Sequence, residues 1–162
     1  MNIIGHSPNK QSDKITVSVI IPAYNAAKLL DQCLNSVLGQ TLKSFEVIIV
    51  NDASTDDSVK IIKDYLAEKN IEASVNVNTL NSASVFRQWE KGAALAKGDL
   101  VWIAEADDLS ELDFLEKLVS GFQDKDLSMA FCQSKKINQD GGVIAENYFD
   151  YTDDVSNRWH KD

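Results

Sequence analysis

The sequence is short of cysteine, of proline and of long apolar runs. Its 162 residues contain two prolines and two cysteines, Cys33 and Cys132, both in apolar surroundings and without neighbours at metal-ligand spacing. We therefore expect buried free thiols in a reducing compartment, and neither a disulfide framework nor a zinc site. No apolar run reaches the roughly 18 residues that span a bilayer, so no integral membrane segment is predicted. We expect a cytoplasmic protein, and a peripheral association with the inner membrane face through a longer parent protein stays open.

Positive charge is scarce as well. Lysine and arginine number 16 against 25 aspartates and glutamates, which gives a formal net charge of −9. No basic stripe offsets this balance, so the sequence argues against a nucleic-acid partner. An anionic ligand would need a local positive group, such as a metal ion, to offset the surrounding negative charge.

The apolar pattern predicts one α/β domain with a substantial core. Short β-branched runs alternate with amphipathic stretches, which implies right-handed crossovers and a parallel sheet. Strands are expected at 15–23, 45–50, 73–77, 100–104 and 127–133, and helices at 27–38, about 54–70, 84–97 and 111–122. A hairpin is expected between residues 134 and 146, where Gly141 and Gly142 signal a turn.

The same pattern predicts the domain boundaries. Residues 1–14 are polar and lack the apolar core of a signal peptide, so they are expected to form a lead-in. The domain itself is expected to cover residues 15–149. Residues 150–162 show no clear period and are expected to be an irregular tail that continues in a longer parent chain.

An acidic cluster ends the most apolar strand of the chain. The stretch 100–108, LVWIAEADD, runs from a predicted buried strand straight into Glu105, Asp107 and Asp108. Carboxylates crowded at the end of a buried strand repel one another and resist desolvation, and a bound cation relieves both effects. Oxygen ligands of this type suit Mg²⁺ or Mn²⁺. A solvated acidic loop is the alternative.

Three polar clusters follow predicted strands. They are Tyr24–Asn25, Asn51–Asp52 and Glu105–Asp108. Because parallel strands end at the same edge of a sheet, and ligands bind outside those carboxyl ends, we expect the three clusters to surround one site.

The motifs VSVIIPAYN (17–25), VNDASTDDS (50–58) and KGDLVWIAEADD (97–108) resemble those of family 2 glycosyltransferases. The resemblance implies the GT-A fold, a Rossmann-like, mostly parallel sheet flanked by helices. It also implies inverting, metal-assisted transfer of a sugar from a UDP- or dTDP-sugar to an acceptor hydroxyl. The acceptor would be a glycan or a lipid-linked molecule, and cell-surface polysaccharide synthesis is the process that the resemblance suggests.

The resemblance also implies which residues form the site. The nucleotide base and ribose would be held by Pro22, Ala23, Tyr24, Asn25 and Asp52. The D-x-D metal motif of the family corresponds here to Glu105, Ala106 and Asp107, with Asp108 beside them, and Asp107 and Asp108 are the expected metal ligands. Structural roles are the alternatives: Tyr24 could close the sheet edge, and Asp52 could cap the next helix. Asp56 and Asp57 are expected to interact with that helix's dipole.

Two positions depart from the family pattern. Glu105 stands where the family more often has aspartate, and Trp89 stands where an arginine is common. Arg87 or Lys91 could contact a phosphate instead, and Lys91 as a solvated helix residue is an equal alternative. Trp89 is expected to pack in the core.

The chain is shorter than family 2 enzymes, and no residue matches their acceptor-activating carboxylate. Asp150, Asp153, Asp154 and His160 are interpreted as tail residues. We therefore expect a truncated domain, and a nucleotide-sugar-binding module without turnover is the leading alternative. A sugar nucleotidyltransferase and a receiver-like signalling domain rank behind it.

Overall fold

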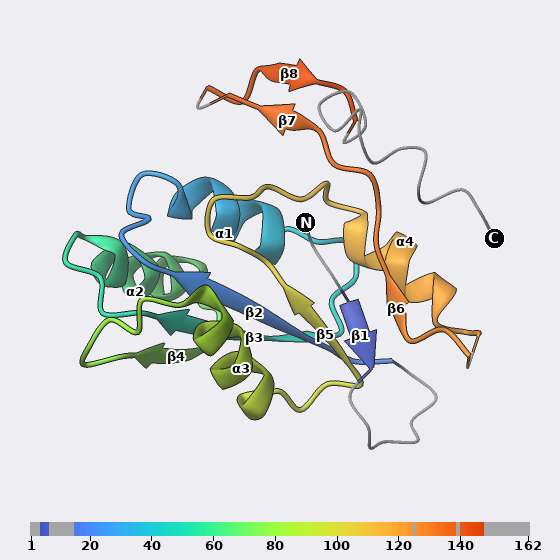
Figure 1. Cartoon of the computed structure of the whole chain (residues 1–162), viewed down its shortest axis with the longest axis horizontal. Coiled ribbons are helices and arrows are strands. Elements are labelled where there is room, and N and C mark those ends of the chain that lie inside the picture. The colour runs from blue at the N-terminus through green and yellow to red at the C-terminus, as the bar shows by residue number, and fades with distance from the viewer. Residues whose placement is uncertain (1–3, 7–14, 125, 139, 148–162) are drawn as a thin grey trace. The chain divides into compact units, whose positions relative to one another are not determined.

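The computed structural model describes residues 4–6, 15–124, 126–138 and 140–147. These residues fall into two compact units, one ending at Ala130 and one starting at Phe131. The first unit holds a six-stranded sheet with the strand order β4-β3-β2-β5-β1-β6 (Figure 1). Its strands are β1 Ile4–His6, β2 Val17–Ala23, β3 Phe45–Asn51, β4 Ser74–Val77, β5 Leu100–Ile103 and β6 Met129–Ala130. Its helices are α1 Leu30–Leu38, α2 Ser58–Lys69, α3 Val85–Leu95 and α4 Phe114–Gly121.

Four neighbouring strands, β4, β3, β2 and β5, are parallel, as the alternation of strands and helices predicted. Strand β2 pairs with β3 from Val17↔Phe45 to Ala23↔Asn51, and with β5 from Val17↔Leu100 to Ile20↔Ile103. Strand β4 extends the parallel part beside β3. The loops after β2, β3 and β5 therefore leave the sheet at one edge.

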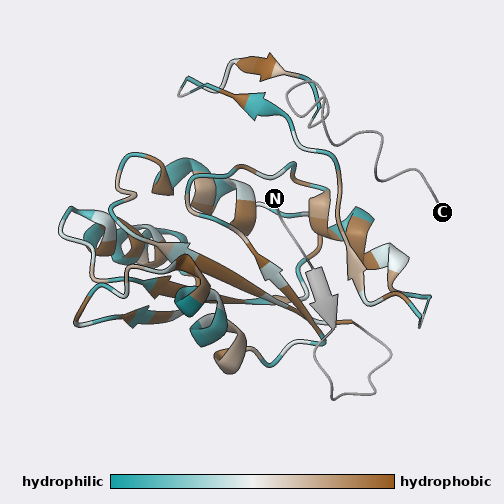
Figure 2. Ribbon diagram, viewed as in Figure 1, coloured by the Kyte–Doolittle hydropathy of each residue, from teal (hydrophilic) through white to brown (hydrophobic). Residues whose placement is uncertain are grey.

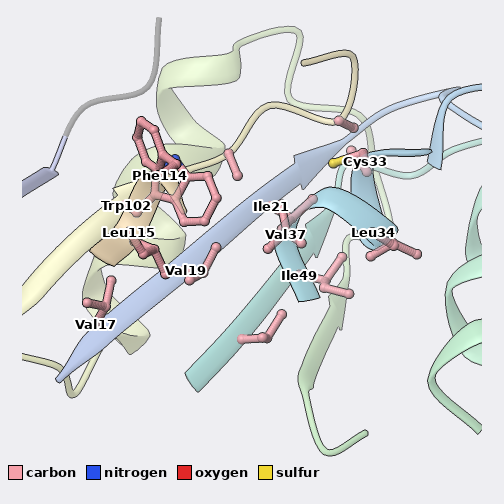
Figure 3. Packing of buried hydrophobic residues seen from close by; sticks show 14 of the residues in the cluster. Val17, Val19, Ile21, Cys33, Leu34, Val37, Ile49, Trp102, Phe114 and Leu115 are labelled. Carbon is pink, nitrogen blue, oxygen red and sulfur yellow. The ribbon is translucent and has the colours of Figure 1, made fainter. Parts of the chain in front are cut away.

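Helices cover both faces of the parallel strands. In β2, Val19 and Ile21 point to one face and Ile20 to the other, since side chains alternate along a strand. The larger cluster joins the first face to Leu30, Cys33, Leu34 and Val37 of α1, Ile62 and Leu66 of α2, and Phe114 and Leu115 of α4 (Figure 3). Helix α3 packs on the opposite face (Figure 1). Burial on both faces explains the nearly continuous apolar runs of the central strands (Figure 2).

Gly92 allows α3 to lie close to the sheet. A Cβ atom at this position would clash with Cγ2 of Ile20, a fully buried side chain of β2. Helix α3 carries Gln88 and Trp89 toward the carboxyl edge, so the close approach at Gly92 also determines where these two side chains lie.

We expect Gly92→Ala to destabilise the fold by about 1–3 kcal/mol, because Ile20 must shift in a packed core. Gly121→Ala is the matched control, since this glycine also lies in a helix and its added Cβ would meet only Leu127 at 3.4 Å. The control should be neutral or stabilising by up to about 1 kcal/mol. Urea denaturation of both variants measures the difference, and equal stabilities would contradict the packing argument.

Several elements differ from the sequence prediction. The residues Ile4–His6 lie inside the predicted polar lead, yet they form β1, which pairs antiparallel with β5 and β6. The strand predicted at 127–133 is reduced to Met129–Ala130. Both outcomes depend on pairing partners that are distant in sequence, which a local pattern does not reveal. The prediction of a buried Cys132 was wrong, because this thiol is exposed.

Gly98 lies beyond the end of α3 and does not cap it. Helix α3 ends at Leu95 and Ala96 is its cap residue. Gly98 instead lies against β2, where an added Cβ would be 2.6 Å from the backbone nitrogen of Ser18. Gly39 is the cap residue at the end of α1.

In the second unit the described residues form a short hairpin. Strand β7, Lys136–Ile137, pairs antiparallel with β8, Val143–Ala145, which confirms the predicted hairpin. Gly141 supplies the left-handed backbone conformation of the turn, with φ of 80°. The acidic tail residues and His160 lie outside the described residues, and the predicted domain bounds stay a prediction. None of the described helices is long and apolar enough to span a bilayer.

Candidate functional site

A cavity of about 480 Å³ lies at the carboxyl edge of the parallel strands. This volume falls in the range of small-molecule sites, roughly 300–1,000 Å³. The cavity is lined by eight of the ten residues predicted for the site, namely Pro22, Ala23, Tyr24, Asn25, Asp52, Glu105, Ala106 and Asp107. The three polar strand ends therefore meet, as the parallel topology predicted. Asn81, Ala83, Ser84, Val85 and Gln88 complete the described polar and apolar wall on the α3 side.

The loop after β2 is tied to the loop after β3. Asn25, with a left-handed φ of 48°, donates its backbone N–H to Ser54 Oγ over 2.9 Å. Its side-chain oxygen accepts the Thr55 N–H over 2.8 Å. Tyr24, beside it, is half exposed at the cavity. These bonds fix the loop while the Tyr24 ring stays accessible to a ligand.

None of Asp52, Ser54 and Thr55 is the cap residue of α2. The helix begins at Ser58 with Asp57 as its cap residue, and Asp57 makes no side-chain capping bond. Asp56 accepts the backbone N–H groups of Ser58 at 3.0 Å and of Ala27 at 3.1 Å. Burial alone would raise the pKa of Asp56, but these hydrogen bonds outweigh it and lower the pKa. Asp56 is therefore committed to the loop rather than to a ligand.

Asp52 is buried at the centre of a hydrogen-bond network. Its Oδ1 accepts from the Asn78 amide at 2.7 Å and from the Ser82 backbone N–H at 3.0 Å. Its Oδ2 accepts from the same N–H at 3.0 Å and from the Ser82 hydroxyl at 2.8 Å. The two carboxylate oxygens thus engage most of their roughly four acceptor sites within the protein itself.

The surroundings of Asp52 favour its charged form. Burial would raise its pKa, but the hydrogen bonds from Asn78 and Ser82, together with the positive charge of Lys91, outweigh burial and lower the pKa. Lys91 donates to Asn78 Oδ1 over 2.6 Å, so it is not a purely solvated residue. It is not among the residues that line the cavity. Gln88 joins the network by donating to Ser82 Oγ over 2.6 Å.

Sequence reasoning missed Asn78, Ser82 and Gln88 as members of the site. The polar run 78–84, NTLNSAS, indicates a turn, but a turn signal does not say which carboxylate the turn will surround. Ala83 in this turn has a left-handed φ of 52° and lines the cavity.

Glu105 is held by Trp89. The indole Nε1–H donates to Glu105 Oε1 over 2.6 Å. The expectation that Trp89 packs as a core residue was therefore wrong, since its ring is only half-buried and its polar edge faces the acidic cluster. Burial raises the pKa of Glu105, the Trp89 hydrogen bond opposes this, and the charges of Asp107 and Asp108 raise the pKa further.

Asp107 lies exposed at the cavity wall, whereas Asp108 is half-buried and is not part of that wall. No group of three or more His, Cys, Asp or Glu side chains within the described ranges could hold a metal by itself. Mg²⁺ typically binds through one or two carboxylates together with water and substrate phosphates. An exposed aspartate at the mouth of a cavity fits that mode, in which a diphosphate supplies the remaining oxygens.

Arg87 and Cys33 lie in different surroundings. Arg87 is exposed on α3 and is not among the cavity-lining residues, and its contact with a phosphate stays a prediction. Cys33 is buried, as predicted, with its Sγ 3.5 Å from the backbone oxygen of Glu105. Burial, followed by the charges of Asp108, Asp107 and Glu105, raises the pKa of this thiol to about 12, which leaves it unreactive at neutral pH.

Comparison with known proteins identifies the class to which this sheet and cavity belong. The profile of Glycosyl transferase family 2 matches residues 18–161, so the chain belongs to this glycosyltransferase family, and the expected GT-A fold is confirmed. Among the relatives, chondroitin synthase of Pasteurella multocida is 31% identical over 82% of this chain and 14% of its own length. The glycosyltransferase YibD of Escherichia coli, itself uncharacterised, is 37% identical over 73% of this chain and 33% of its own length.

Solved structures agree with the sequence relatives. TarS of S. aureus, residues 1–349, superposes with a TM-score of 0.61 at 28% identity, covering 68% of this chain and 33% of TarS 1–349. TarS has also been solved in complex with UDP and with UDP-GlcNAc. The mannosyltransferase PcManGT from Pyrobaculum calidifontis, in complex with GDP-Man and Mn²⁺, has a TM-score of 0.55 at 25% identity, covering 59% of this chain and 28% of its own. The chain thus spans a third or less of these relatives.

Proposed function

We propose that this chain is the donor-binding part of an inverting glycosyltransferase that uses a UDP- or dTDP-linked sugar and a divalent cation. The observation that carries the proposal is the single cavity in which Tyr24, Asp52 and Asp107 meet. The UDP and UDP-GlcNAc complexes of TarS support a uridine nucleotide, and the Mn²⁺ complex of PcManGT supports a divalent cation. Polysaccharide synthesis is supported by the names of the chondroitin and hyaluronan synthases.

The nucleotide base would lie against Tyr24 and reach Asp52. Because Asp52 already accepts several hydrogen bonds, an imide N–H must replace one internal donor. The Ser82 hydroxyl is suited to this exchange, since it lies 2.8 Å from Asp52 Oδ2 and 3.1 Å from the Ser84 carbonyl oxygen. A hydroxyl carries one proton and can turn from one acceptor to the other. The uracil or thymine imide would then take the vacated position on Oδ2.

The acidic end of β5 would hold the rest of the donor. Glu105 can accept a sugar hydroxyl, while Asp107, with Asp108 behind it, would hold Mg²⁺ or Mn²⁺ beside the diphosphate. When bound, the ion supplies Lewis-acid stabilisation of the charge on the departing nucleoside diphosphate. In the transfer, the acceptor oxygen bonds to the anomeric carbon and the carbon–oxygen bond to the phosphate breaks with its electron pair. The hydroxyl proton passes to a base that we do not assign to any described residue.

The tests of this function are a nucleotide panel and a turnover assay. Thermal shift with UDP, dTDP, CDP, GDP and ADP, each with and without Mn²⁺, should show stabilisation by UDP or dTDP with Mn²⁺. A ligand at about one hundred times its Kd adds roughly 2.7 kcal/mol to the free energy of unfolding. Stabilisation by none of the nucleotides would contradict the proposal, and stabilisation by purine nucleotides alone would contradict the pyrimidine assignment.

Turnover distinguishes an enzyme from a binding module. We assign the acceptor-activating base to none of the described residues, and binding without turnover is therefore the second candidate function. Release of UDP from UDP-GlcNAc, with and without added glycan acceptors, measures the difference. Binding without release of UDP would support the module.

A further inference from the structure

We propose that Trp89 is a positioning residue that holds the carboxylate of Glu105 in place for a hydroxyl group of the bound ligand. The proposal rests on the proposed function, because it assigns a role within the same donor cavity. Trp89 lies on α3, the helix on the opposite face of the sheet from α1. It lies outside the three motifs by which the chain resembles its family. Its starting point is the 2.6 Å hydrogen bond from Trp89 Nε1 to Glu105 Oε1.

The Trp89 side chain is constrained by one ring contact and by the position of its helix. Phe86, one turn earlier on α3, contacts it edge-on with ring centroids 5.0 Å apart and an interplanar angle of 77°. The helix itself is held against β2 at Gly92, where there is no room for a side chain. A tryptophan held in this way loses little conformational freedom when it donates its hydrogen bond, so the bond can orient Glu105 effectively.

Glu105 has acceptor capacity left for a ligand. A carboxylate offers about four acceptor sites, and Trp89 occupies one of them on Oε1. In the part of the chain that the structure describes, no hydrogen bond reaches Oε2, while the residue lines the cavity. The open oxygen is therefore available to a donor that enters the cavity.

The chemistry of the pair favours a hydroxyl over a phosphate. Indole is an uncharged donor, so it does not offset the negative charge of the Glu105 carboxylate, and a carboxylate without a cation beside it repels a diphosphate. Its bond to Trp89 also occupies one acceptor site of Oε1 that a cation could otherwise use, whereas Asp107 is exposed and accepts no hydrogen bond from another side chain among the described residues. In this arrangement Asp107 would bind the metal, and Glu105 would accept a hydrogen bond from a hydroxyl of either the ribose or the transferred sugar.

The decisive experiment is a double-mutant cycle on ligand affinity. Kd for UDP-GlcNAc with Mn²⁺, a ligand that carries both the ribose and the sugar hydroxyls, is measured by calorimetry for the wild type, Trp89→Phe, Glu105→Ala and the double variant. Phenylalanine keeps an aromatic ring beside Phe86 and removes the N–H donor together with part of the indole ring. The packing loss is common to both backgrounds, so the cycle cancels it. We expect Trp89→Phe to raise Kd about tenfold more in the wild-type background than in the Glu105→Ala background, the factor typical of losing a hydrogen bond to a charged group.

Two further ligands distinguish the source of the hydroxyl. If the ribose supplies it, 2′,3′-dideoxy-UDP should bind wild type and Trp89→Phe equally. If the transferred sugar supplies it, Trp89→Phe should raise the Kd for UDP-GlcNAc and leave the Kd for UDP unchanged. If Trp89→Phe raises Kd by the same factor with and without Glu105, the proposal is overturned, because a residue that acts only by packing would give that result.

A spectroscopic measurement tests the pair without any ligand. The indole ¹⁵N–¹H resonance of Trp89 should lie downfield and move upfield in Glu105→Ala, while Glu105→Gln, which retains an acceptor oxygen, should largely preserve it. Trp102 is the internal control, because its buried Nε1–H has no hydrogen-bond partner among the described residues. An unchanged Trp89 resonance in Glu105→Ala would overturn the pairing. Failure of UDP to bind the wild type, with the pairing intact, would instead count against the proposed function.

Discussion

Replacing Asp52 with alanine is expected to lower the free energy of unfolding by about 3 kcal/mol and to abolish nucleotide binding. The substitution removes the acceptor of the Asn78 amide, the Ser82 backbone N–H and the Ser82 hydroxyl in a buried position. Each buried donor left without a partner costs about 1–3 kcal/mol, although water entering the cavity recovers part of that loss. Urea denaturation and a UDP titration measure the two effects.

Asp52→Asn isolates the charge from the shape of the side chain. The amide keeps the size of the carboxylate but turns a donor group toward other donors, so we expect a smaller loss of about 2 kcal/mol. Asp57→Asn is the matched control, because Asp57 is exposed in the same loop and makes no capping bond. The control should stay within about 0.5 kcal/mol of wild type.

The pH dependence gives the same prediction an independent test. The pKa of Asp52 is lowered in the folded state, so its contribution to stability is present above its unfolded pKa of about 3.9 and is lost as pH falls through the folded value. The stability difference between wild type and Asp52→Asn should therefore be largest near pH 7 and should shrink below about pH 4. A difference that is constant from pH 7 to pH 3 would show that Asp52 is not the buried anion inferred from its contacts.

Much of the candidate site could be predicted from the order of the elements. The alternation of strands and helices requires a parallel sheet, and a parallel sheet brings the ends of β2, β3 and β5 to one edge. Tyr24, Asp52 and Asp107 follow those three strands, so their meeting in one cavity needed no knowledge of side-chain packing. Continuous apolar runs predicted that both faces of these strands are covered, and α1 and α3 cover them.

The partners of the two central carboxylates could not be predicted in this way. Ser82 reaches Asp52 across 30 positions of the sequence, and the bond depends on the left-handed turn at Ala83. Trp89 reaches Glu105 only because Gly92 lets α3 approach β2 closely. A helical pattern predicts which residues face the sheet, but it does not predict which carboxylate at a strand end will accept the indole N–H of a tryptophan. The same limit applies to β1, whose three residues form a strand only because β5 offers them an open edge.

Asp107→Ala is expected to remove the metal-dependent part of UDP binding while leaving the fold intact. Asp107 is exposed, so the free energy of unfolding should change by less than about 0.5 kcal/mol. If Mn²⁺ is held by this carboxylate and by the diphosphate, losing the carboxylate should weaken Mn²⁺-dependent UDP binding by at least about tenfold. Calorimetry in Mn²⁺ and in EDTA measures the effect, and the variant in Mn²⁺ should resemble the wild type in EDTA.

Two control variants separate coordination from simple charge. Asp57→Ala removes the same unit of negative charge from the loop after β3, and it should slightly strengthen binding of an anion or leave it unchanged. Asp108→Ala tests the second predicted ligand, which is half-buried and not part of the cavity wall, so its effect should be smaller than that of Asp107→Ala. If Asp107→Ala binds UDP as tightly as wild type in Mn²⁺, the metal assignment is wrong. If Asp108→Ala alone loses the metal dependence, the ion is held one residue further along the chain, behind the exposed aspartate.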